Sequence, residues 1–113
     1  LFTHLHLDHF DTTVIDKCLK ENGKIIGYKK HEKAILKLNK NYVLLENDEF
    51  FEENDIIFRS IFSLDGIGEE QTAWIVSHQN TKIFHGGDTI WHNQFWKLGK
   101  ENPNITYAFL PIN

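Results

Sequence analysis

The chain has 113 residues, of which 41% are hydrophobic and 13% aromatic, and this composition suits one globular domain with a buried core. The formal net charge is −4, so the sequence lacks the basic field that nucleic-acid binding usually needs. The single cysteine, Cys18, excludes an intramolecular disulfide and favours a reducing, cytoplasmic location. No run of about 18 apolar residues occurs, so no membrane span is predicted.

The N-terminal part predicts a strand end, a histidine-rich loop and a helix. Residues 1–3 are apolar and read as the last residues of a strand. Residues 11–21 predict a helix that Asp11 can cap, with Cys18 on its buried side. The apolar positions with helical spacing in this segment are Val14, Ile15, Cys18 and Leu19.

The middle of the chain predicts strands joined by short connections. Residues 24–28 and 42–46 are apolar runs of strand length, and residues 31–39 between them have the spacing of a short amphipathic helix. Residues 47–55 are acidic and predict a surface connection that holds two buried phenylalanines. Residues 56–64 alternate in part and predict a strand.

The C-terminal part predicts a hairpin formed by residues 72–78 and 82–87, then a helix over residues 90–102 and a last strand over residues 106–112. The side chains of this helix that we expect to face inward are Trp91, Phe95, Trp96 and Leu98. Strands outnumber helices and pair as hairpins, so the fold class is a mixed α/β (α+β) chain rather than a simple alternating parallel fold.

Metal-type ligands crowd the first eleven residues, LFTHLHLDHFD. In an extended segment the side chains at i and i+2 share one face, so His4 and His6 can bind one ion at about 2.0 to 2.1 Å. As the chain turns toward the helix, Asp8 and His9 can point to a second ion, and paired ions lie only about 3.5 to 4 Å apart. One short segment therefore predicts two adjacent metal positions.

Three stretches of the sequence resemble motifs of a known family. The stretch THLHLDH (3–9) resembles the H-x-H-x-D-H signature of the metallo-β-lactamase-fold hydrolases, and FHGGDT (84–89) is similar to the G-D-T of that family. AFLPIN (108–113) resembles a strand, ending in Leu-Pro-Ile, of the branch typified by ascorbate-6-phosphate lactonases and N-acyl phosphatidylethanolamine phospholipases. The three stretches occur in family order and span nearly the whole chain.

The resemblance implies an αββα sandwich, with two sheets packed face to face, helices outside and a dinuclear site at one edge. Transferred by position, His4 and His6 would bind metal one, Asp8 and His9 metal two, and Asp88 would bridge them. The implied cofactors are two divalent ions, zinc first, with manganese or iron as alternatives.

The implied activity is that of a metal-dependent hydrolase acting on an ester, lactone or phosphodiester-type bond of a small molecule. The nucleophile would be a metal-bound hydroxide, since coordination can lower the pKa of water to about 7. Asp8 is the candidate catalytic residue, because it could orient that nucleophile or pass a proton to the leaving group.

The chain departs from the family pattern at one ligand and at both ends. The third histidine of metal one should lie near residues 60–68, where the sequence has Asp65 instead. Asp65 can be a ligand that favours a harder metal than zinc, or an ordinary turn residue. The last family ligand would fall beyond residue 113 and earlier strands before residue 1, so residues 1–113 are expected to form one incomplete domain. Its open sheet edges could support a homo-oligomer.

Two other functions stay open. A degenerate or truncated family member, binding one metal or none, could act as a binding or assembly module, and the absent third histidine favours this alternative. A nuclease would need a basic substrate arm, and the sequence shows none. Of the other histidines, His31 should begin a helix, His78 should end a strand and His85 should be structural, whereas His92 could face either substrate or solvent.

Overall fold

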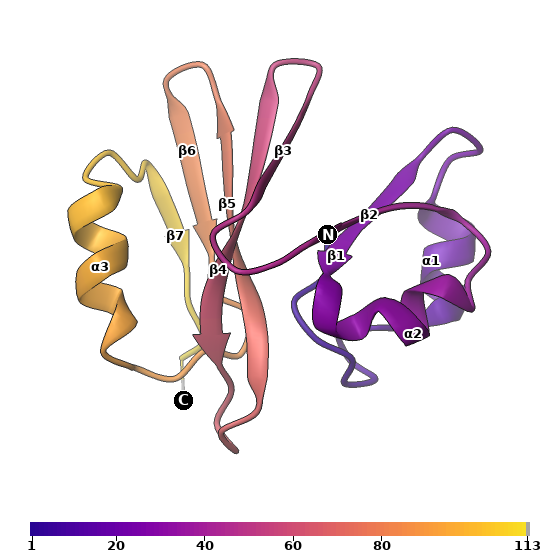
Figure 1. Ribbon diagram of the computed structural model, residues 1–113, viewed down its shortest axis with the longest axis horizontal. Coiled ribbons are helices and arrows are strands. Elements are labelled where there is room, and N and C mark those ends of the chain that lie inside the picture. Colours follow the sequence, from indigo (N-terminus) through magenta and orange to yellow (C-terminus); the bar gives the residue numbers. More distant parts are fainter. Residues whose placement is uncertain (113) are drawn as a thin grey trace.

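The computed structural model describes residues 1–112, so Asn113, the last residue of AFLPIN, lies outside the described residues. Four layers follow one another in Figure 1: the helices α1 and α2, a small sheet, a larger sheet, and the helix α3. This arrangement is the αββα layering that the family resemblance implies. The elements in chain order are α1 (Thr12–Cys18), β1 (Lys24–Tyr28), the 3-10 turn η1 (Lys29–His31), α2 (Glu32–Leu36), β2 (Asn41–Leu45), β3 (Phe50–Glu53), β4 (Ile56–Leu64), β5 (Glu70–His78), β6 (Thr81–His85), α3 (Gln94–Glu101) and β7 (Tyr107–Phe109).

The two sheets differ in size and in strand direction. The small sheet pairs β1 and β2 in parallel, which is possible because the η1–α2 segment crosses over between them. The larger sheet has the order β3-β4-β5-β6-β7, antiparallel as far as β6, with β7 parallel to β6. The predicted hairpin is confirmed as β5 and β6, and His78 ends β5 as expected.

The core lies on both faces of the larger sheet. Trp74 on β5 is 1% exposed and packs with Ile26 and Leu45 of the small sheet. The next residues on either side point to the opposite face, where α3 packs, because successive side chains of a strand alternate. That second cluster consists of Ile61, Ala73, Ile75, Phe84 and Leu98. Since both faces are covered, β5 is buried continuously from residue 71 to residue 75.

The prediction of a surface connection over residues 47–55 was wrong. Part of this segment is β3, which forms a two-residue hairpin with β4. Asn54 and Asp55 both have positive φ, 53° and 62°, as the mirror-image turns of tight hairpins require. Of the two phenylalanines expected to be buried, Phe50 is 64% exposed and only Phe51 packs against the core.

Three side chains expected inside are on the surface. The last helix begins only at residue 94, and it turns Phe95 and Leu98 toward the sheet, whereas Trp91 and Trp96 are 78% and 81% exposed. Cys18 is also exposed, because α1 buries no residue. In both helices the apolar spacing matched a helix, but it did not identify the face that packs.

The N-terminal segment is attached directly to β5, although residues 1–3 do not form a strand. The indole Nε1 of Trp74 donates to the carbonyl of Phe2 at 3.0 Å, and the backbone N of Thr72 donates to the carbonyl of Thr3 at 3.1 Å. These two bonds fix the start of the histidine segment against the larger sheet. Within residues 1–112, no helix has the length and hydropathy needed to cross a membrane.

Candidate metal centre

The histidine segment folds as a turn rather than as an extended strand. The backbone N atoms of His9 and Phe10 both donate to the carbonyl of His6, at 2.9 and 2.8 Å. Asp11 then caps α1, as predicted, by accepting from the backbone N of Thr13 at 2.7 Å. The turn folds His9 back beside His4, so that their ring centroids are 4.2 Å apart.

Asp88 reaches the histidines from the other side, on the turn that follows β6. The preceding residue, Gly87, has φ of +62° and packs directly on Thr3: a Cβ added to Gly87 would lie 2.8 Å from the Thr3 Cβ. The backbone N of Ile90 donates to the carbonyl of Leu64 at 2.9 Å, which holds the end of this turn on β4. Glycine at residue 87 therefore permits the close approach that brings Asp88 to the histidine segment.

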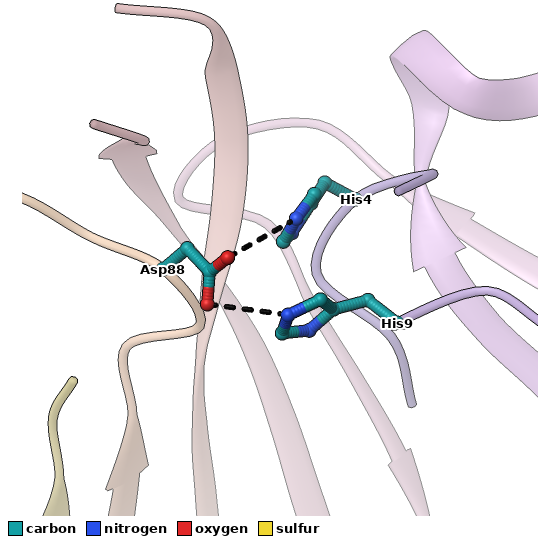
Figure 2. A group of neighbouring side chains, drawn as sticks. All are labelled: His4, His9 and Asp88. Atoms are coloured by element: carbon teal, nitrogen blue, oxygen red, sulfur yellow. Dashed lines mark ion pairs between the residues drawn. The ribbon is translucent and has the colours of Figure 1, made fainter. Parts of the chain in front are cut away.

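The first group of ligand atoms comprises His4, His9 and Asp88, and Figure 2 shows the three side chains pointing toward one another. The two carboxylate oxygens of Asp88 lie 3.7 Å from His4 Nε2 and 3.2 Å from His9 Nε2. Two ligands of one zinc-sized ion, each bonded at about 2.0 to 2.2 Å, are about 3 to 4 Å apart. The spacing of this group fits one divalent ion.

His4 has the state that a metal ligand requires. Its Nδ1 is 2.9 Å from the Thr3 hydroxyl, and its Nε2 is buried without a hydrogen-bond partner among residues 1–112. When Nδ1 donates to Thr3, the Nε2 lone pair faces the carboxylate of Asp88, and a divalent cation between them would satisfy both acceptors. Burial, and then the charges of His9 and His6, lower the pKa of His4, which keeps its imidazole neutral near pH 7.

The second group comprises His6, Asp65 and Glu69. His6 Nε2 lies 4.0 Å from Asp65 Oδ2 and 3.9 Å from Glu69 Oε2. The His6 ring also meets the His4 ring edge to face, with centroids 4.4 Å apart, so the two groups adjoin. The first group offers two imidazoles and one carboxylate, whereas the second offers one imidazole and two carboxylates.

The structure brings together five of the six residues predicted to bind metal, but it pairs them differently from the sequence prediction. His4 and His6, which were predicted to bind the same ion, belong to different groups. Asp88 lies beside His4, predicted to bind metal one, and beside His9, predicted to bind metal two. Asp65 makes a tight turn through Oδ1 while its Oδ2 faces His6. Asp8 is in neither group: its carboxylate is 78% exposed and lies 3.5 Å from His9 Nε2.

Three residues that contribute to the candidate metal centre were not predicted from the sequence. Glu69 supplies a candidate ligand four residues after Asp65. The glycine at position 68 was the sequence signal of a tight turn there, and in the structure its φ is +83°. Thr3 orients His4, and Gly87 makes room for Thr3. Neither of these two roles has a signature in the sequence, because each depends on the contact between two distant segments.

His31 stands at the start of α2, as predicted, as its N-cap residue. Its ring meets the Tyr28 ring edge to face at 5.8 Å, and its Nε2 is buried with no hydrogen-bond partner within the described residues. Burial, and then the charges of Lys30 and His4, lower the pKa of His31. The lowered pKa keeps the His31 imidazole neutral at neutral pH.

His85 and His92 contact protein atoms and neither group of ligands. His85 Nδ1 accepts from the backbone N of Gly87 at 3.1 Å and so supports the turn that carries Asp88. His92 lies against the rings of Phe62 and Phe95, with centroid distances of 5.5 and 4.8 Å, and burial lowers its pKa. His85 is thus structural, as expected, and His92 is half-buried against the rings of Phe62 and Phe95.

Comparison with solved structures places this architecture among known folds. A proposed metal-dependent hydrolase from Parabacteroides distasonis matches 99% of the chain with a TM-score of 0.81 at 22% identity. The isothiocyanate hydrolase from Delia radicum gut bacteria matches 90% with a TM-score of 0.71 at 18% identity. The metallo-β-lactamase fold protein YhfI from Bacillus subtilis matches 86% with a TM-score of 0.65 at 11% identity. No family model and no curated protein sequence matches the chain.

The chain therefore has the metallo-β-lactamase fold, with the candidate metal centre where the histidine segment of one half meets the turn after β6 of the other. It spans about half the length of these proteins, since the matches cover 51%, 44% and 44% of their chains. At these identities the similarity shows the fold.

Proposed function

We propose that the protein is a metal-dependent hydrolase whose site holds two divalent metal ions. The observation that carries the proposal is the convergence of His4, His9 and Asp88 around a buried Nε2 atom that has no other partner within residues 1–112. The adjoining group around His6 supplies ligands for a second ion. The fold shared with the hydrolases described above supports the same proposal.

The residues of the site would have different roles in hydrolysis. Bound divalent ions would polarise the substrate and lower the pKa of water at the site to about 7. Thr3 would fix the tautomer of His4 so that Nε2 faces the metal, and Asp88, whose carboxylate lies beside both His4 and His9, would help to hold the ion of this group. Asp8, exposed and 3.5 Å from His9, would take a proton from the attacking water or give one to the leaving group.

The proposed substrates are small molecules with an ester, lactone or phosphodiester-type bond. Hydrolysis of such bonds needs a nucleophile active at neutral pH and a group that stabilises the developing negative charge, and a dinuclear centre supplies both. Asp8 is exposed beside His9, so a substrate that reaches this side of the centre would meet its carboxylate.

The alternative function is that of a degenerate family member that binds a partner without turnover. The observation in its favour is the second group, where Asp65 stands in the sequence position of the family's third histidine and Glu69 adds a second carboxylate. This alternative predicts a folded protein that hydrolyses none of the three bond types at any metal loading.

The experiment is a hydrolysis screen of the metal-loaded protein on p-nitrophenyl esters, lactones and bis-p-nitrophenyl phosphate, with Asp88→Asn and Asp8→Asn. We expect Asp88→Asn to lose the ion of the first group and, with it, turnover. Asp8→Asn should keep the metal but lose about 10²-fold or more in turnover, the contribution typical of a general acid or base. The matched control is Asp16→Asn, which removes an exposed carboxylate of α1 whose one ion pair within residues 1–112 is with Lys40 at 2.9 Å. Activity that is equal in Asp88→Asn and in the wild type would refute the proposal.

A further inference from the structure

The second group differs from the first in one respect that the proposed function does not use: it is rich in carboxylate. Asp65 is 3% exposed, so its carboxylate is almost completely removed from water. Its Oδ1 accepts from the backbone N atoms of Ile67 and Glu69, at 3.0 and 2.8 Å. Its Oδ2 accepts no hydrogen bond from residues 1–112 and faces His6.

Burying the carboxylate of Asp65 this far is costly unless hydrogen-bond donors or a cation lie beside it. Glu69 extends from the same turn, and its side chain, 69% exposed, directs Oε2 to within 3.9 Å of His6 Nε2. The turn is closed at both ends, because the backbone N of Asp65 also donates to the carbonyl of Glu69 at 2.9 Å. The two carboxylates are therefore held on one side of a single imidazole.

We propose that Glu69 is a metal ligand, and that with His6 and Asp65 it forms a position whose preference for Zn²⁺ over Mn²⁺ is much weaker than that of the group around His4. This inference rests on the proposed function and specifies the ligands and the metal of the second position. Imidazole nitrogen suits zinc, whereas carboxylate oxygen suits manganese and other hard ions. Zinc still binds more tightly than manganese at both positions, in keeping with the general order of divalent affinities, but the margin is smaller at the second.

The test is Mn²⁺ and Zn²⁺ binding to the chelator-stripped protein, with Mn²⁺ followed by electron paramagnetic resonance and Zn²⁺ by competition. We expect Glu69→Gln to weaken one of the two Mn²⁺ sites by about tenfold or more, and to leave the other site unchanged. Glu69→His should increase the ratio of Zn²⁺ to Mn²⁺ affinity at the same site. Since the Glu69 side chain is mostly exposed, neither change should impair folding, which far-ultraviolet circular dichroism checks.

The matched control is Glu52→Gln, which makes the same charge change on an exposed residue of β3. An equal loss of Mn²⁺ affinity in Glu52→Gln and Glu69→Gln would overturn the inference, because the effect would then be one of total charge. Unchanged binding in Glu69→Gln would overturn it as well.

Failure of this inference and failure of the proposed function would give different experimental results. If Glu69 is not a ligand, Zn²⁺ still binds at the first group and is released by Asp88→Asn. If the proposed function fails, the wild type shows no turnover in the hydrolysis screen whatever residue occupies position 69, and metal binding still decides whether Glu69 is a ligand.

Discussion

Replacing Gly87 by alanine tests whether the two halves of the metal centre depend on the close contact between the turn after β6 and Thr3. The added Cβ would lie 2.8 Å from both Cβ and Cγ2 of Thr3, against a normal carbon–carbon contact of about 3.5 to 4.0 Å. Thr3 is 4% exposed and its carbonyl is bonded to Thr72, so it has little freedom to retreat.

Two costs combine at this position. A left-handed φ costs about 1 to 2 kcal/mol for a residue with a Cβ, and overpacking costs about 1 to 3 kcal/mol. We therefore expect Gly87→Ala to lower the free energy of unfolding by about 2 to 5 kcal/mol. Because relief of the clash moves Asp88 away from His4, metal affinity should fall as well.

Two other glycines separate these costs. Gly68 has φ of +83° with no atom within 4 Å of an added Cβ, so Gly68→Ala should lose only the backbone part. Gly99 lies in α3 with equally open space, so Gly99→Ala should be neutral or slightly stabilising. Urea unfolding gives the stability of each variant, and zinc titration gives the metal affinity. A Gly87→Ala protein as stable and as tight for zinc as Gly99→Ala would refute the reasoning.

Two further predictions concern the support of the site. Trp74→Phe removes the donor to the Phe2 carbonyl, so it should cost about 1 to 3 kcal/mol and weaken zinc binding, whereas Trp91→Phe, at an exposed ring, should leave both unchanged in urea unfolding and zinc titration. The metal-free protein should lose stability on acidification from about pH 7.5 to about pH 5.5, because burial lowers the pKa of His4 and His92. The unfolded chain then binds more protons, so their contribution is complete above about pH 6.5 and is lost as the pH falls through the folded-state pKa values. Urea midpoints across this range check the sign, and a midpoint that rises on acidification would contradict it.

The sequence alone predicts the elements whose formation depends on interactions between residues close together in the chain. Asp11 predicted the start of α1 because a carboxylate can accept from the free N–H groups of a first turn. The apolar runs on either side of residues 79–80 predicted the β5–β6 hairpin. In each case the deciding interactions lie within a few residues of one another.

Features that depend on contacts between distant segments were not accessible. The pairing of His4 with His6 assumed an extended segment, whereas the bonds to the His6 carbonyl make a turn that places His9 beside His4. Glu69 was overlooked because nothing in the spacing of the chain points from residue 69 to residue 6. Trp96 was assigned to the wrong face because apolar periodicity gives the period of a helix, while packing against the sheet sets the phase.

The number of divalent ions bound by the purified protein tests the central claim most directly. Metal analysis after dialysis should give about two ions per chain for the wild type. Asp88→Asn should lose the ion bound between His4 and His9, while Asp16→Asn should retain both. A wild-type protein without bound metal, or one whose metal content is the same in Asp88→Asn, would contradict the account.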